Sequence, residues 1–243
     1  MSAYEIYIAY STIVRKEIQR FMRIWVQTLL PPSIIMVLYF IIFGNLIGSR
    51  IGQMGGFDYM QFIVPGLIMM SVISNSYGNV VSSFYSTKYQ GSLEEMLVSP
   101  MPNWVILAGY VTGGVARGLA VGTIVTCLSL FFTQLDVHNL GIIVLVVLMT
   151  SILFSLGGFI NAVFANSFDD IAIVPTFILT PLTYLGGVFY SIDLLPDFWA
   201  SVSQLNPILY MVNAFRFGIL GVSDIPVGYS LLVICGFIIA LFS

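Results

Sequence analysis

Long apolar runs separated by short polar stretches dominate the pattern of this chain. A helix of about 20 apolar residues is long enough to cross the hydrocarbon core of a bilayer. The pattern therefore predicts about six transmembrane helices, over residues 24–47, 59–83, 104–132, 140–164, 171–189 and 227–242. The last run is short and has no polar tail, so we expect the mature chain to continue past Ser243. The predicted fold class for residues 1–243 is a single all-α integral membrane domain.

Residues 1–23 carry charges throughout and lack the apolar core of a secretory signal. Large apolar side chains recur in this segment at helical spacing, at Tyr7, Tyr10, Val14, Ile18, Phe21 and Trp25. The opposite side carries Thr12, Lys16, Gln19 and Arg23. This pattern predicts an amphipathic helix in the membrane interface, with Arg15 and Arg20 near anionic lipid headgroups. A polar lead-in that is amphipathic by chance is the plainer alternative.

Residues 191–226 are too polar and too interrupted to cross the membrane, yet they contain strongly apolar clusters. Two short helices that dip into the outer leaflet would account for both properties, with Asn206 and Pro207 as the break between them. Irregular backbone persists at membrane depth only where protein buries it. We therefore predict a re-entrant outer segment packed on the other helices.

The basic residues are distributed unevenly between the two sides of the predicted bundle. If the amino terminus is cytoplasmic, five of the eight Lys and Arg residues lie inside, namely Arg15, Lys16, Arg20, Arg23 and Lys88. The predicted external loops instead carry several aspartates. Because cytoplasmic loops are enriched in Lys and Arg, this asymmetry predicts a cytoplasmic amino terminus.

Composition supports a membrane protein, since hydrophobic residues make up 58% of the chain and charged residues only 8%. A soluble domain usually carries about 25% charged residues. The net charge of -3 indicates little about partners, because the positions of the charges matter more. Cys127 and Cys235 lie in apolar runs and are interpreted as small buried hydrophobes, with no disulfide or metal site.

Motifs for catalysis are absent from the sequence. The lysines, Lys16 and Lys88, are not part of a nucleotide-binding loop, and His138 as the only histidine excludes a multi-histidine metal site. The few scattered basic residues argue against nucleic-acid binding. We predict a non-enzymatic chain without a metal or cofactor, driven by a partner or acting as a passive pore.

An ion- or proton-coupled carrier that acts alone is the alternative function. Such a carrier typically places ionisable carboxylates inside its spans, whereas each Asp and Glu here falls in a predicted loop or end. A membrane scaffold without transport activity is a third hypothesis. The acidic segment at residues 88–102 and the re-entrant segment argue against a mere scaffold.

Arg117 lies near the middle of a predicted span, where an arginine costs about 2.5–3.5 kcal/mol on insertion scales. It must therefore face protein or water. In one interpretation it meets an anionic substrate; in the other it bonds Asn75, Asn79 or backbone carbonyls. The neighbouring Gly114, Gly118 and Gly122 form a small-residue ridge that permits close helix packing.

Several motifs occur together in a specific order. They are RIWVQTLLPP in the first span, FIVPGLIMM at 62–70, LEEMLVSPMP at 93–102, PTFILTPLTYLGGVFYSIDLLP at 175–196 and LNPILYMVNAFR at 205–216. In these motifs the chain resembles the permease subunits of ABC-2 type transporters over essentially its whole length. The resemblance implies an exporter in a bacterial inner membrane, built from a homodimer of this chain and two ATPase subunits. ATP and magnesium are then used by the ATPase partner, and short cytoplasmic permease helices relay its motion.

Residues 88–102 have the composition expected of such a relay. Gly91 and Ser92 can begin a short helix, and Pro100 and Pro102 end it. The candidate coupling residues are Leu93, Glu94, Glu95, Met96 and Leu97. The alternative is an ordinary connecting loop with a solvated acidic pair.

Two further sets of candidate residues follow from the polar spans and the outer segment. The candidate pathway residues are Asn75, Asn79, Arg117, Thr180 and Tyr184, although such polar residues also join helices to one another. The candidate outer gate comprises Phe198, Asn206, Pro207, Tyr210, Phe215 and Arg216. By its match to the family motif, Arg216 is expected to brace the re-entrant helices; an arginine that snorkels to the interface is the alternative.

Overall fold

A computed structural model describes residues 2–242, whose regular secondary structure is helical apart from one short hairpin. The helices are α1 (Ala3–Arg23), α2 (Trp25–Thr28), α3 (Leu30–Tyr39), η1 (Phe40–Ile47), α4 (Gly48–Ile51), α5 (Tyr59–Tyr89), α6 (Ser92–Val98), α7 (Asn103–Ser129), α8 (Leu140–Phe164), α9 (Phe168–Val174), η2 (Pro175–Leu179), α10 (Thr180–Tyr184), η3 (Ile192–Leu194), α11 (Asp197–Gln204), α12 (Pro207–Leu220) and α13 (Val227–Phe242). The antiparallel strands β1 (Gln53–Met54) and β2 (Phe57–Asp58) form the hairpin, with Gln53 opposite Asp58. The predicted all-α class is confirmed.

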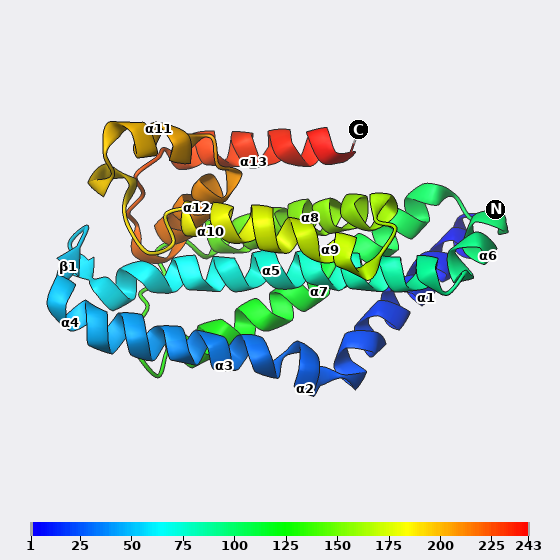
Figure 1. Cartoon of the computed structure of the whole chain (residues 1–243), viewed down its shortest axis with the longest axis horizontal. Helices are drawn as coiled ribbons and strands as arrows, with labels where there is room; N and C mark the ends of the chain where they lie inside the picture. The colour runs from blue at the N-terminus through cyan, green and yellow to red at the C-terminus, as the bar shows by residue number, and fades with distance from the viewer. Residues whose placement is uncertain (1, 243) are drawn as a thin grey trace.

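The long helix α5 runs through the bundle and packs against α7 and α8 (Figure 1). Helix α1 packs against α7, and α12 and α13 pack against α8 and each other. Helix α6 and the start of α1 lie at one end of the long axis, which we call the α6 end. Helix α4, strand β1 and helix α11 lie at the opposite end, which we call the hairpin end (Figure 1).

Three helical stretches within the described residues are long and apolar enough to cross a membrane. They are Trp25–Ile51, Asn103–Ser129 and Leu140–Phe164; Pro207–Leu220 and Val227–Phe242 are shorter apolar helices. The predicted span 171–189 is divided into α9, η2 and α10. The change to π-helix begins at Pro175, which has no backbone N–H to donate. Pro31 and Pro32 lie in the first turn of α3, where the lost donors have no partner in the helix.

Helix α1 is present as predicted, but the face that it buries differs from the predicted apolar face. It buries Ile13, Glu17 and Phe21, whereas Tyr7 and Trp25 are exposed. Spacings of four residues place the three buried side chains on one face, and Ile13 and Glu17 contact Gly109 and Gly113 of α7. The helix is therefore docked on the bundle by a polar as well as an apolar contact.

The burial predicted for the two cysteines is wrong. Cys127 of α7 and Cys235 of α13 are both exposed on the surface of the chain. Hydrophobicity does not require burial within protein here, because the lipid-facing surface of a membrane helix is itself apolar.

Small residues allow α5, α7 and α8 to pack closely. At Gly114 of α7, an added Cβ would lie 3.0 Å from the carbonyl oxygen of Ser76. At Gly158 of α8, it would lie 2.6 Å from the carbonyl oxygen of Tyr77. The predicted small-residue ridge on α7 does lie in a close contact, and α8 provides a second one. Both fix α5 tightly between its neighbours.

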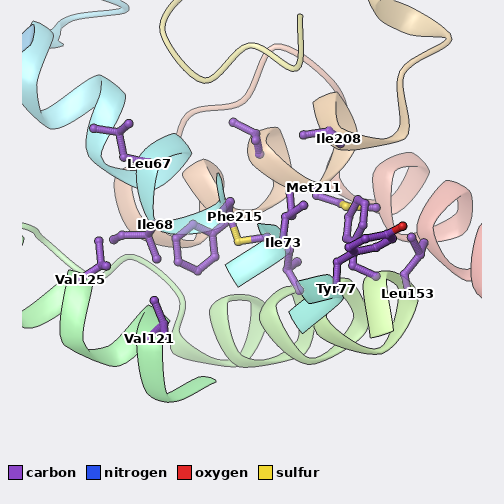
Figure 2. Close-up of a cluster of buried hydrophobic side chains, with 14 of the residues drawn as sticks. Leu67, Ile68, Ile73, Tyr77, Val121, Val125, Leu153, Ile208, Met211 and Phe215 are labelled. Atoms are coloured by element: carbon purple, nitrogen blue, oxygen red, sulfur yellow. The ribbon is translucent and has the colours of Figure 1, made fainter. Parts of the chain in front are cut away.

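The hydrophobic core joins α5 to α7, α8 and α12 (Figure 2). Figure 2 shows Leu67, Ile68, Ile73 and Tyr77 of α5 among Val121, Val125, Leu153, Ile208, Met211 and Phe215. Phe215, a candidate gate residue, is 3% exposed and belongs to this core. Residues 191–226 do contain two helices, α11 and α12, that are separated at Asn206 and Pro207 as predicted. Burial of α12 in the core supplies the protein environment that such a segment needs.

Candidate functional site

The predicted coupling segment forms a helix, α6, at the α6 end of the bundle. Gly91 precedes it with a φ of 78°, a left-handed conformation that favours glycine, and the helix stops before Pro100. Glu94 and Glu95 lie in its first turn and are exposed. Leu93 and Met96 pack against the core, whereas Leu97 is 54% exposed. Helix α6 is thus anchored by one apolar face and presents two carboxylates and a leucine outward.

Apolar grooves flank α6 on both sides. One, of about 500 Å³, is lined by Leu93 and Leu97 together with Trp104 of α7 and Phe159 of α8. The other, of about 420 Å³, lies between Met96 and the Thr12–Lys16 side of α1. The surface around α6 therefore combines two apolar grooves with two carboxylates. Exposed apolar surface of this kind is typical of a site where another protein binds.

Lys88 connects the base of this segment to the end of α8. Its Nζ donates hydrogen bonds of 2.7 Å to the carbonyl oxygens of both Val163 and Ala165. These carbonyls lie at the carboxyl end of α8, where a positive charge is favoured by the helix dipole. Just beyond, the backbone N–H of Asn166 donates a hydrogen bond to the Asp170 carboxylate. This bond, and to a lesser extent the hydrogen bond with the Ser167 side chain, lowers the pKa of Asp170 from its ordinary value. The α6 end is thereby held together by charged groups.

A cluster of polar side chains lies between α1, α5 and α7, and we call it the polar seam. It consists of Glu17, Arg20, Asn75, Asn79, Ser83 and Arg117. Glu17 is fully buried; its Oε1 accepts 2.6 Å from the Ser83 hydroxyl, and its Oε2 lies 3.4 Å from Arg20 Nη2. Arg20 Nη2 also donates 2.8 Å to Asn79 Oδ1. These contacts tie α1 to α5.

Arg117 occupies the same seam one turn beyond Gly113 on α7. Its Nη2 donates to Asn75 Oδ1 at 3.1 Å and to the Thr28 carbonyl oxygen at 3.3 Å. These are the kinds of contact that the structural interpretation of Arg117 expects. The burial of Glu17 was not predicted from the sequence, although its spacing from Ile13 and Phe21 would have indicated a buried position.

The other candidate pathway residues lie elsewhere. Thr180 and Tyr184 are both exposed, and the Tyr184 hydroxyl lies 3.3 Å from that of Tyr39 of α3. Tyr39 also packs on Phe189, as does Tyr184. No hydrogen bond joins this aromatic cluster to the polar seam within residues 2–242. The five candidate residues therefore form two groups, one in the polar seam and one at the surface.

Arg216 is 1% exposed, so the snorkelling alternative is wrong. Its Nε donates 3.3 Å to the Phe62 carbonyl oxygen and its Nη2 donates 2.6 Å to the Gly187 carbonyl oxygen. The guanidinium carbon lies 3.9 Å from the centre of the Phe62 ring, a cation–π distance. Arg216 therefore links α12 to α5 and to the connection that follows α10.

The remaining gate candidates divide between structural contacts and the surface. Asn206 caps α12 by accepting from the Ile208 N–H, and its Nδ2 donates 2.5 Å to the Leu182 carbonyl oxygen. Pro207 opens α12, and the Tyr210 hydroxyl donates 2.6 Å to the Gln204 carbonyl oxygen. Phe198 is 69% exposed at the hairpin end.

Among residues 2–242, no group of three or more His, Cys, Asp or Glu side chains is arranged to hold a metal. The chemistry that the arrangement offers is one of binding and packing. Helix α6 presents an exposed surface, and residues 191–226 are braced from within the bundle by the contacts of Arg216.

The sequence pattern of ABC-2 type transporters matches residues 8–220, so the chain belongs to this family. It is accordingly the membrane permease subunit of an ABC transporter, which implies a separate ATPase partner, and it is not the catalytic subunit. Over 236 residues it is 61% identical to the inner membrane transport permease YadH of Escherichia coli strain K12, covering 97% of this chain and 92% of that protein. It is also 22% identical over 207 residues to nodulation protein J of Rhizobium leguminosarum bv. viciae, covering 85% and 80% of the two chains.

Proposed function

We propose that this chain is the permease subunit of an ATP-driven exporter in a bacterial inner membrane. It moves a substrate from the cytoplasm or the inner leaflet outward by alternating access between two conformations. The similarity to permeases named for the inner membrane supports this location. Two copies of the chain and two ATPase subunits form the working complex.

Helix α6 is the observation that carries this proposal. Glu94, Glu95 and Leu97 project from a short helix whose opposite side is anchored on the bundle. A motion of a partner bound there is passed to α5 directly, because α6 follows α5 after a two-residue turn. Lys88 extends the same linkage to α8. Leu93, Glu94, Glu95, Met96 and Leu97 are therefore the proposed contact with the ATPase.

The proposed orientation places the α6 end in the cytoplasm. Helix α1, which starts at the α6 end (Figure 1), carries Arg15, Lys16, Arg20 and Arg23, and Lys88 lies in the last turn of α5, next to α6. The positive-inside rule supports the assignment. In this proposal six helical segments cross the membrane. They are the three long apolar stretches, α5, the α9–η2–α10 series and α13. The re-entrant pair α11–α12 then caps the outer side.

The proposed route lies at the exposed face that carries Thr180 and Tyr184, beside α3 and α5. Ser74 of α5 is exposed as well, which gives that helix a polar position outside the core. A second copy of the chain would enclose this face and remove it from lipid. Asn75, Asn79 and Arg117 belong to the route only in a conformation that opens the polar seam. Arg216, Asn206, Pro207 and Tyr210 hold the proposed outer gate in position, and Phe198 and Phe215 supply its apolar packing.

The test is a double substitution, Glu94→Ala with Glu95→Ala, in the permease reconstituted with its ATPase in proteoliposomes. Both side chains are exposed, so the variant is expected to fold normally while transport-linked ATP hydrolysis falls by about tenfold, as for loss of a charged interface contact. Asp197→Ala at the hairpin end is the matched control, because it removes an exposed carboxylate from the first turn of another helix. Unchanged ATPase stimulation in the double variant, or an equal loss in the control, contradicts the proposal.

A further inference from the structure

The polar seam contains more positive than negative charge. Arg20 and Arg117 each contribute a guanidinium group, whereas Glu17 contributes the seam's carboxylate. The pair of Arg20 with Glu17 is a single contact of 3.4 Å. Arg117 has neutral acceptors, the Asn75 amide oxygen and the Thr28 carbonyl oxygen. The positive charges of Arg20 and Arg117 also act on each other unfavourably. One positive charge in the seam is therefore left without a counter-ion among the described residues.

The unused hydrogen-bonding atoms of the seam are all donors. Arg20 Nε, Arg117 Nε and Asn79 Nδ2 are buried and have no acceptor within the described chain. Asn79 is fully buried, and its Oδ1 already accepts from Arg20. Buried polar groups normally have partners, so three unused donors beside an unbalanced charge indicate a missing acceptor that is negatively charged.

The seam reaches the surface of the chain at Arg20, close to the bend between α1 and α3. The Arg20 side chain is 29% exposed, so an anion can reach the seam beside it. Trp25 and Val26 are more than half exposed directly after this point. Exposed tryptophan next to arginine is typical of the headgroup level of a membrane. A lipid can therefore place its headgroup in the seam and its chains along the exposed apolar face of α3.

We propose that the polar seam binds the phosphate group of an anionic lipid headgroup. Phosphate matches the donor set because its oxygens accept several N–H bonds at once from guanidinium and amide groups. The orientation given under the proposed function, on which this part of the proposal rests, places the lipid in the cytoplasmic leaflet. Binding at the seam would join α1, α5 and α7 through one ligand. Free phosphate offers the same chemistry, and the experiment separates the two sources.

The test is a lipid titration of the purified full chain in a neutral maltoside detergent, followed by native mass spectrometry. Phosphatidylglycerol is compared with diacylglycerol of the same acyl chains, and inorganic phosphate is added in a separate arm. We expect one phosphatidylglycerol to bind about tenfold more tightly than diacylglycerol, a ratio typical of charge-assisted hydrogen bonds. Arg117→Gln should abolish this preference. Arg23→Gln is the matched control, since Arg23 is exposed in the last turn of α1, and it should retain the preference.

Glu17→Gln distinguishes a binding role from a merely structural one. Its amide oxygen can still accept from Ser83, while the loss of the carboxylate charge should tighten phosphatidylglycerol binding. If Arg117→Gln does not fold, this variant decides alone: tighter binding supports the proposal, and unchanged or weaker binding overturns it. Equal binding of the two lipids also overturns it. So does binding of inorganic phosphate without a preference for phosphatidylglycerol over diacylglycerol. Because no ATPase is present, the result is independent of the Glu94 and Glu95 experiment.

Discussion

Substitution of Gly158 by alanine tests the close contact between α5 and α8 on which the bundle depends. An added Cβ would lie 2.6 Å from the Tyr77 carbonyl oxygen, whereas ordinary contact begins at 3.4 Å. The two helices would therefore have to separate by about 0.8 Å, the difference between these distances. The obstacle is backbone, so no side-chain rotation relieves it.

Gly157 provides the control one residue earlier on the same helix. Its added Cβ would meet the Tyr77 ring at 3.9 Å, which is an ordinary contact. Both substitutions gain about 1 kcal/mol of helix propensity, and this gain cancels in the comparison. Overpacking costs about 1–3 kcal/mol. Gly158→Ala should therefore be less stable than Gly157→Ala by about 1–3 kcal/mol.

The assay is unfolding by SDS in mixed maltoside micelles, followed by circular dichroism, with the free energy of unfolding compared between the two variants. A hydrogen bond of 2.7 Å from Asn161 Nδ2 to the Tyr77 hydroxyl joins the same two helices. Separation of α5 from α8 in Gly158→Ala should weaken this bond as well. If Gly158→Ala is as stable as Gly157→Ala, the close approach of α5 and α8 is refuted.

Two further substitutions follow from the burial of Phe215 and the contacts of Lys88. Phe215→Ala should lower the free energy of unfolding by about 3–5 kcal/mol, and Phe198→Ala by less than about 0.5 kcal/mol, because Phe215 lies in the core and Phe198 is exposed. The same SDS assay checks both, and similar losses would contradict the assignment. Lys88→Met should speed amide hydrogen exchange in the last turn of α8 about fivefold, as expected for about 1 kcal/mol of lost capping, while Lys88→Arg should retain most of the protection. Unchanged exchange in Lys88→Met would show that its two hydrogen bonds add no stability.

The polar seam and the aromatic cluster show where sequence reasoning about the site reached its limit. The residue types were recognised correctly as polar positions inside apolar helices. Their grouping was not, because Asn75, Asn79 and Arg117 lie in the polar seam between α1, α5 and α7, whereas Thr180 and Tyr184 are exposed. Neighbouring positions on one helix diverge by about 100°. If the assumed buried face of a helix is wrong by one residue, its side chains are therefore assigned to the wrong neighbouring helix.

The sequence by itself determined the membrane class, the main helices, the short helix between Gly91 and Pro100, and the break at Asn206 and Pro207. These features depend on composition, on local periodicity and on residues that begin or end helices. The tertiary structure decided that Glu17 is buried and that Trp25 and Cys127 are exposed. The physical reason is that lipid and protein interior are both apolar, so hydrophobicity places a residue in the membrane without saying which of the two it contacts. Only the packing of α1, α5 and α7 against one another makes that choice.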